Sequence, residues 1–230
     1  MKYPYTRTRG TIRYVTSDGA ECGREWFSLH RHDRGRFVRA VCEMEEDGLL
    51  RDASWSLDRN WRPIDGHVRV ILDGKVTGST SYSFDGSSVA CHAHTDTHGH
   101  VSAVKHSDRT YEFLGLHALI CDGLLTAVRG RDDVNRERSI NSITCSYSLH
   151  GEEGLLAFPI DIGVAYCGEE RLIIAAGEFD AHKFHVRWRP EWTPASIWVW
   201  GEDYIFLKSM WEVSGLTCEL TSLEVAPPVS

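Results

Sequence analysis

Apolar and polar residues alternate along most of this chain, which is the pattern of strands that bury one face. Successive side chains of an extended strand point to opposite sides, so Ile143, Cys145 and Tyr147 would share one face. The same alternation runs through residues 36–44, 53–57, 140–149, 160–166, 171–176, 182–188, 197–200, 204–208 and 216–223. Together with the hairpins described next, these segments predict an antiparallel, all-β chain.

The dipeptide Asp-Gly occurs six times, and two of the six separate strongly alternating segments. Both residues tolerate the positive φ angles that tight hairpin turns need. Asp73-Gly74 and Asp85-Gly86 therefore predict a meander of three strands at 67–72, 75–84 and 89–101.

Residues 108–129 show the helical period instead. The apolar positions recur at steps of three and four, at Phe113, Leu116, His117, Ile120 and Leu124. A single apolar helix must cover a sheet face or close a barrel end to bury its stripe. The sequence thus predicts one domain over 1–230, an antiparallel open or closed β-barrel packed on an apolar helix, with a flexible tail at 226–230.

Composition limits the classes of partner. The chain of 230 residues is 42% hydrophobic and has a net charge of −8 without any long basic run, so we expect no nucleic-acid partner. No apolar stretch is long enough to cross a bilayer, and we expect no membrane association. The oligomeric state stays open, with a homodimer as one option.

The cellular compartment and the cofactors are also constrained. The N-terminus lacks the apolar run of a signal peptide, and the seven cysteines form no Cys-x-x-Cys pair. Free thiols and the missing leader indicate a cytoplasmic location. No nucleotide-binding or P-loop motif occurs, so we expect no cofactor.

A ladder of histidines follows the meander. His92, His94, Asp96, His98 and His100 take every second position of 89–101 and would share one strand face. This face either turns to water or binds a metal, as in a metal-dependent hydrolase that would use His92, His94, Asp96 and His98. The four ligands would be spread over about 20 Å at ~3.3 Å per residue, whereas zinc holds nitrogens at about 2 Å, so we expect no metal.

The ladder also resembles the His-x-His-x-Asp-His metal loop of the metallo-β-lactamase family. His92, His94 and Asp96 fit that pattern, but Thr97 stands where the adjacent histidine belongs. No alternation of strands and helices follows, as that α/β fold would require.

A second resemblance lies in the C-terminal third. The segment 176–184, followed in order by 197–199, Asp203-Tyr204 and 218–221, resembles uncharacterised bacterial proteins with an open antiparallel barrel of the lipoprotein-carrier type. The resemblance covers about residues 50–225. It implies a strongly curved sheet that wraps a helical plug and holds an apolar ligand. That family is usually exported, whereas this chain shows no signal peptide.

Two histidines are candidates for acid–base chemistry. His182 shares its strand face with Phe184 and Trp188, so it is expected to point inward, and His117 lies in the apolar helical segment. A buried imidazole can titrate in a useful range. We predict His182 as acid or base, assisted by His117 or by Asp180. The alternative is that both are core histidines with hydrogen-bonded neighbours.

Aromatic residues are candidates for a ligand pocket. Trp198 and Trp200 share a strand face, and Trp188, Phe184 and Tyr147 complete the predicted ligand-binding set. Such side chains suit flat or polycyclic apolar ligands, although tryptophan also fills large β-cores. We therefore predict a barrel that binds a small apolar molecule and carries out cofactor-free lyase, isomerase or cyclase chemistry. The alternatives are a non-catalytic carrier and the metal-dependent hydrolase.

Overall fold

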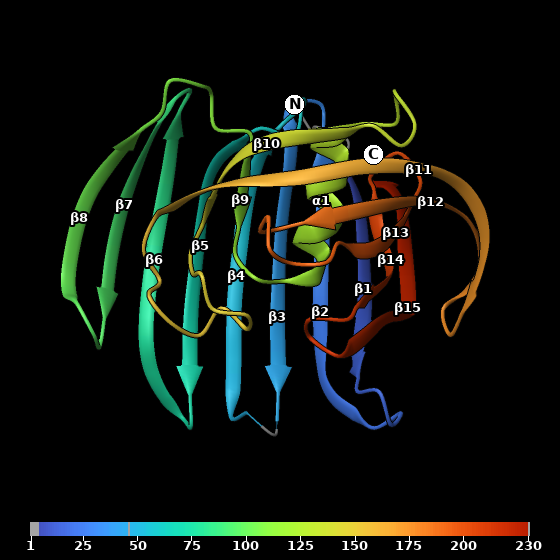
Figure 1. The fold of residues 1–230 in the computed structure, drawn as a ribbon, viewed down its shortest axis with the longest axis horizontal. Helices are drawn as coiled ribbons and strands as arrows, with labels where there is room; N and C mark the ends of the chain where they lie inside the picture. Colours follow the sequence, from blue (N-terminus) through green and yellow to red (C-terminus); the bar gives the residue numbers. More distant parts are fainter. Residues whose placement is uncertain (1–4, 46, 230) are drawn as a thin grey trace.

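The computed structural model describes residues 5–45 and 47–229, which form strands around one helix (Figure 1). The helix α1 spans Leu119–Arg129. Within the described residues the strands are β1 (Tyr5–Val15), β2 (Glu21–His32), β3 (Gly35–Met44), β4 (Leu49–Asp58), β5 (Pro63–Leu72), β6 (Lys75–Asp85), β7 (Ser88–Thr95), β8 (Gly99–His106), β9 (Phe113–Gly115), β10 (Glu137–Thr144), β11 (Phe158–Ile174), β12 (Gly177–Arg187), β13 (Ala195–Trp200), β14 (Ile205–Trp211) and β15 (Leu216–Val229).

All strands of the described chain belong to one sheet that is curled but not closed. Its order is β8-β7-β6-β5-β4-β3-β2-β1-β15-β14-β13-β12-β11-β10-β9, so β8 and β9 are its edges. Neighbouring strands are antiparallel, except that β9 runs parallel to β10. The predicted class, an antiparallel open barrel with one helix, is confirmed.

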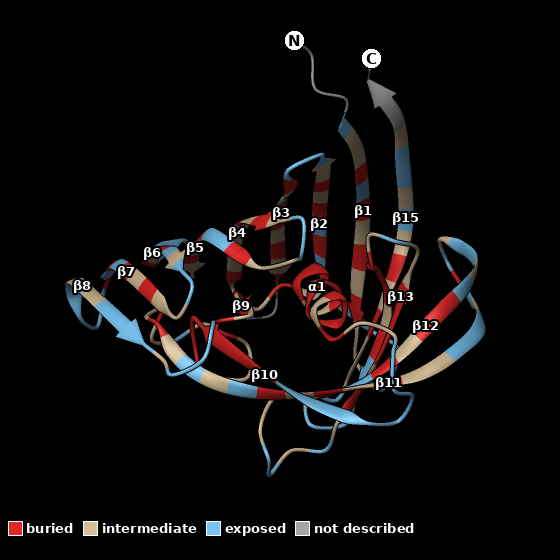
Figure 2. Ribbon diagram, turned by 90° about the horizontal axis from the view of Figure 1, so that it is seen from above, coloured by how far each residue is buried: buried red, intermediate tan, exposed pale blue. Residues whose placement is uncertain are grey.

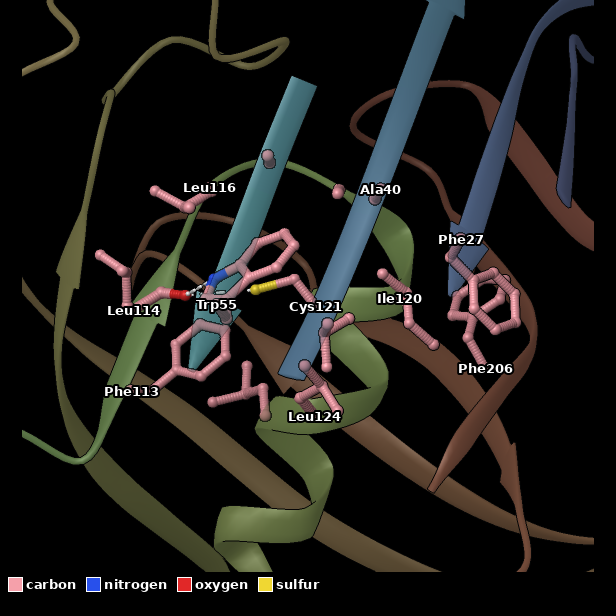
Figure 3. Close-up of a cluster of buried hydrophobic side chains, with 14 of the residues drawn as sticks. Phe27, Ala40, Trp55, Phe113, Leu114, Leu116, Ile120, Cys121, Leu124 and Phe206 are labelled. Carbon is pink, nitrogen blue, oxygen red and sulfur yellow. Dashed lines mark hydrogen bonds between the residues drawn. The ribbon is translucent and has the colours of Figure 1, made fainter. Parts of the chain in front are cut away.

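The curl places α1 between the two halves of the sheet. β10 and β11 lie across from β2–β5, and the mostly buried helix fills the space between them (Figure 2). Around it, Trp55 of β4 donates its indole N–H to the carbonyl of Leu114 at 3.0 Å, beside Phe113, Cys121 and Leu124 (Figure 3). No helix in the described part of the chain is long and apolar enough to span a membrane.

The hairpin predictions hold at the turns that join successive strands. Asp73-Gly74 joins β5 to β6 and Asp85-Gly86 joins β6 to β7, with Gly74 and Gly86 at positive φ. Two of the six Asp-Gly pairs lie inside elements, at 65–66 in β5 and 122–123 in α1.

Several boundaries differ from the sequence expectations. The helix occupies only the second half of 108–129, because His117 has a positive φ of 55° and residues 113–115 pair with β10 as a strand. The segment 160–166 and residues 171–174 of the segment 171–176 form one strand, β11, with a bulge near Gly168, and residues 175–176 form the turn to β12. The predicted tail at 226–230 overlaps the end of β15, where Val229 pairs with Tyr5, and residue 230 lies outside the described residues.

Candidate functional site

A cavity of about 160 Å³ lies beside the N-terminal end of α1. Residues from both halves of the sheet line it, among them Met44 of β3, Ile162 of β11 and Leu216 of β15. The wall is mostly apolar, with a few polar side chains at buried positions. This combination is typical of sites that bind small molecules.

Aromatic side chains surround the more exposed part of the cavity. The ring centroid of Trp211 lies 4.7 Å from that of Trp188 and 5.2 Å from that of Trp192. The guanidinium of Arg189 lies over Trp192 and over Tyr147, at 4.8 Å and 5.3 Å from the ring centroids. These five side chains, which we call the aromatic mouth, offer flat surfaces for stacking.

Arg51 forms part of the buried wall. It belongs to the inward face of β4 with Ala53 and Trp55, and only 3% of its surface is exposed. Its two Nη atoms donate to the backbone carbonyls of His117 and His150, while its Nε has no hydrogen-bond partner in the described structure. The guanidinium therefore holds together two loops of the cavity wall.

His117 stands immediately before α1. Its Nε2 lies 3.2 Å from the carbonyl oxygen of Ser146, to which it donates a hydrogen bond, and 3.3 Å from the hydroxyl of Thr144. Burial and then the positive charge of Arg51 lower the pKa of His117 to about 4. The imidazole is thus neutral near pH 7, with its second nitrogen, Nδ1, as a lone-pair acceptor.

The first turn of α1 is capped by a side chain from a distant strand. Ala118 at the N-cap offers no side-chain acceptor. Instead, the buried carboxyl of Glu25 accepts the backbone N–H groups of Leu119 at 2.6 Å and Ile120 at 2.9 Å, and the hydroxyl of Tyr14 at 3.0 Å. Burial raises the pKa of Glu25, and these hydrogen bonds oppose that shift.

Asp122 lines the cavity from the first turn of α1. It keeps part of its surface accessible because it faces the cavity, and its carboxyl has no hydrogen-bond or ion-pair partner among the described residues. Burial, and then the charge of Glu25, raise the pKa of Asp122 well above its ordinary value. The cavity therefore contains a carboxyl group held toward its neutral, proton-bearing form.

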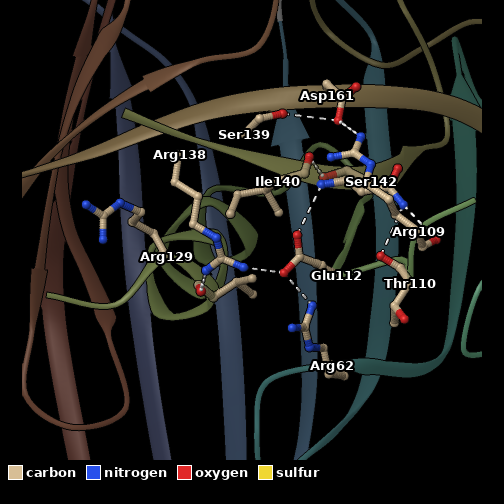
Figure 4. Close-up of polar contacts among 12 residues, drawn as sticks. Arg62, Arg109, Thr110, Glu112, Arg129, Arg138, Ser139, Ile140, Ser142 and Asp161 are labelled. Atoms are coloured by element: carbon tan, nitrogen blue, oxygen red, sulfur yellow. Dashed lines mark hydrogen bonds and ion pairs between the residues drawn. The ribbon is translucent and has the colours of Figure 1, made fainter. Parts of the chain in front are cut away.

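A polar cluster outside the cavity fixes the chain segment that leads to α1 (Figure 4). Glu112 forms ion pairs with Arg62 of the β4–β5 turn, at 2.7 Å, and with Arg138 of β10. It also accepts the backbone N–H of Asn141. These contacts connect β10 to the first half of the sheet and so position His117 and the start of α1.

His182 points inward as the sequence predicts, but it belongs to a different group of side chains. Its Nε2 lies 2.6 Å from Arg131, and its Nδ1 lies 3.2 Å from the hydroxyl of Tyr166 and 3.4 Å from Glu169. Burial and then Arg131 lower the pKa of His182. His182 does not line the cavity, and in the described structure it shares no contact with His117. Its catalytic role stays a prediction.

Asp180 is exposed on β12, opposite Arg171 of β11. Asp180 does not line the cavity, whereas His117 does. The structure therefore does not bring together the three residues predicted for acid–base work.

Of the aromatic residues predicted to bind the ligand, only some line the cavity. Trp188 and Tyr147 belong to the aromatic mouth, but Trp198 and Trp200 do not line the cavity, although Trp198 is buried. The register pairs Trp198 with Lys183, on the side of the sheet opposite to the buried Phe184. Phe184 packs against Tyr166 and Tyr204 in the core, and does not line the cavity.

The histidine ladder is two strands and a turn rather than one strand. β7 ends at Thr95, whose hydroxyl accepts the backbone N–H of His98, and β8 begins at Gly99 with a φ of 64°. His94 stacks on His100 across the hairpin at 4.2 Å.

The ladder faces solvent. His92, His94, Asp96 and His98 are exposed, whereas the alternate residues Val89, Cys91 and Ala93 are buried. Within the described residues, no three His, Cys, Asp or Glu side chains are placed to hold a metal ion.

Sequence reasoning missed Arg51, Glu25 and Asp122. Arg51 carries a readable signal, since it is a charged residue at an inward position of β4, whereas Glu25 lies in a strand that the sequence did not predict. Asp122 had no such signal, because its role depends on the cavity that distant strands build.

The comparisons with known proteins bear on the fold. No protein-family model matches the chain, and a search of the curated proteins finds no match. Among solved structures, a β-barrel-like protein of a domain of unknown function, DUF1849, from Brucella abortus is 7% identical and covers 98% of both chains with a TM-score of 0.59. A DUF1089 family protein from Pseudomonas aeruginosa is 12% identical over 80% of this chain and 87% of its own, with a TM-score of 0.47. The Brucella protein is therefore similar to this chain in fold. The Pseudomonas protein has a TM-score below 0.5, which supports no further conclusion.

Proposed function

We propose that the protein binds a small, largely apolar molecule in the cavity at the start of α1. The observation that carries the proposal is an apolar cavity inside the curled sheet that is lined on one side by the adjoining, mutually tilted rings of Trp188, Trp192 and Trp211. A cavity of about 150 Å³ can hold a benzene molecule, and the cavity here measures about 160 Å³. One aromatic ring would lie inside, and a larger ligand would extend along the aromatic mouth.

This size favours a small ring compound over the acyl chains of a lipoprotein. The resemblance to lipoprotein-carrier barrels supports the general idea of a helix-plugged barrel with an apolar ligand. The fold shared with the Brucella abortus protein supports the architecture alone.

Fluorescence of the neutral probe N-phenyl-1-naphthylamine tests the proposal, since its emission increases in apolar surroundings. We expect saturable binding of one probe per chain. Ser209→Leu, which fills the cavity wall, should weaken binding at least tenfold, because the buried Ser209 lines the cavity. The same change at Ser196, which lies outside the cavity wall, is the control. Equal affinities in both variants would contradict binding in this cavity.

A second pair of variants tests whether the probe binds at the aromatic mouth or to exposed apolar side chains in general. Trp211→Ala should weaken binding, whereas Trp26→Ala should not, because Trp26 is 40% exposed and does not line the cavity. Weakening by both changes to the same degree would count against a specific site.

We further propose cofactor-free acid–base chemistry in this cavity, with Asp122 in the role predicted for His182. The supporting observation is the unpartnered carboxyl of Asp122, whose pKa is raised by burial. Asp122 would give its proton to one atom of the ligand, while the neutral Nδ1 of His117 takes a proton from another. The ligand would isomerise without net gain of atoms, and exchange with water would return a proton to Asp122 and remove the one gained by His117.

Deuterium exchange distinguishes the enzyme from a carrier. A bound ligand recovered from D₂O should carry deuterium at the transferred position, and Asp122→Asn should slow its incorporation by ~10²–10⁴. His182→Ala is the matched comparison. Loss of incorporation in His182→Ala with normal rates in Asp122→Asn would restore the original prediction for His182. A tightly bound ligand recovered without deuterium would indicate a carrier.

A further inference from the structure

Arg51 differs from the other well-buried arginine of the described chain in what surrounds its charge. Arg129 is 4% exposed and pairs with Asp132 while donating to the carbonyls of Val164, Asp133 and Arg136. Arg51 is 3% exposed, yet no carboxylate of the described residues lies within ion-pair distance of it. A buried charge is normally paired.

Arg51 has more N–H donors than its hydrogen bonds use. A guanidinium carries five N–H groups, and the backbone carbonyls of His117 and His150 take two of them. The remaining three, including the buried Nε–H, find no acceptor in the described structure. Arg51 and both accepting residues line the cavity, and because the Nε atom is buried, the remaining N–H groups of the two Nη atoms are the donors that a ligand in the cavity would meet.

We propose that Arg51 binds an anionic group of the ligand, a carboxylate, so that the molecule held in this cavity is an apolar acid. This proposal rests on the proposed binding function and adds the chemical class of the ligand. The carboxylate would accept the unused N–H groups of the two Nη atoms, in the bidentate geometry that guanidinium favours. The apolar part of the molecule would then extend toward Trp188 and Trp211.

The other titratable groups around the cavity agree with an anionic ligand. The pKa values of Glu25 and Asp122 are raised and that of His117 is lowered to about 4, and each shift favours the neutral form. Tyr14 also lines the cavity, and burial raises its pKa well above the ordinary value. Arg51 is therefore the side chain that gives the buried part of the cavity its positive charge.

The test compares 2-naphthoate with 2-naphthamide, which have the same rings and nearly the same size but differ in charge. Isothermal titration calorimetry on the full chain at neutral pH should show that the acid binds about ten- to a hundredfold more tightly than the amide, the range expected for charge-assisted hydrogen bonds. Equal affinities, or tighter binding of the amide, would overturn this inference while leaving apolar binding intact. If neither compound binds, the proposed binding function fails and this inference fails with it.

Variants of Arg51 test whether this side chain causes the difference in affinity between the acid and the amide. In Arg51→Met the ratio of the two affinities should fall to near one. In Arg51→Lys, which keeps the charge but loses the paired N–H donors of the guanidinium, the ratio should fall in part. Arg39→Met is the control, because Arg39 is exposed on the neighbouring strand and pairs with Asp52. A wild-type ratio in Arg51→Lys and Arg51→Met alike would overturn the assignment. If circular dichroism shows that Arg51→Met is unfolded, the Arg51→Lys ratio decides.

Discussion

Replacing His117 by asparagine should remove a pH-dependent part of the stability of this protein. Asparagine is the suitable replacement because the backbone at His117 has a φ of 55°, a region that asparagine tolerates. The pKa of His117 falls from the ordinary 6.5 to about 4, first through burial and then through Arg51. Between these two pH values the unfolded chain binds a proton at His117 that the folded chain does not.

The sign and size of the effect follow from this difference. Because the folded-state pKa lies below the unfolded value, the contribution of His117 is full above pH 6.5 and is lost as the pH falls to about 4. The loss over the whole window is roughly 3 kcal/mol, at about 1.4 kcal/mol for each pKa unit. That is a large part of the stability of about 5–15 kcal/mol that is usual for a folded domain.

Urea unfolding of the wild type and of His117→Asn at several pH values between 4 and 7 measures the effect. The two free energies of unfolding should converge as the pH falls. Glu25 and Asp122 titrate in both proteins, so their opposing contributions cancel in the difference between the curves. A difference that stays constant from pH 7 to pH 4 would refute the argument that His117 is held neutral by burial.

Two further substitutions test the packing around α1. Glu25→Ala leaves two backbone N–H groups of the helix and the hydroxyl of Tyr14 without their acceptor, and should lower the free energy of urea unfolding by roughly 3–5 kcal/mol. The control is Glu21→Ala, at the exposed start of the same strand, and an equal loss of stability in both variants would contradict the capping role of Glu25. Gly123→Ala would place a Cβ 2.7 Å from the carbonyl oxygen of Tyr204, so it should lower the melting temperature and cost ~1–3 kcal/mol. The gain of about 1 kcal/mol that helix propensity alone predicts would argue against this close packing.

Much of the fold could be predicted from local patterns, because alternation and hairpin turns involve neighbouring residues. The strands β1 and β2 were not predicted, since their inward faces mix large apolar residues with small or polar ones. Thr8 and Gly10 of β1, and Gly23 and Glu25 of β2, interrupt the apolar pattern. Gly10 lies against Leu220 and Glu25 caps α1, so the burial of such positions depends on partners far away in the sequence.

The site was predictable only in part for the same reason. Alternation correctly placed His182 and Phe184 inward, but it could not separate a packed core from a cavity. The curl of the sheet determines which inward side chains pack in the core and which line the cavity. Arg51 contacts His117 and His150, which lie 66 and 99 positions further along the chain. No local pattern contains such a contact.

The pairing of β1 with β15 has a consequence for how the protein is made on the ribosome. β1 finds β2 directly after a short turn, but its other edge pairs with residues such as Glu219, which lies 206 positions after Arg13. Until β15 emerges, the nascent chain carries an extended strand with an open hydrogen-bonding edge, to which other extended chains can add. Aggregation during translation should therefore depend on how well the edge of β1 is shielded before β15 leaves the exit tunnel.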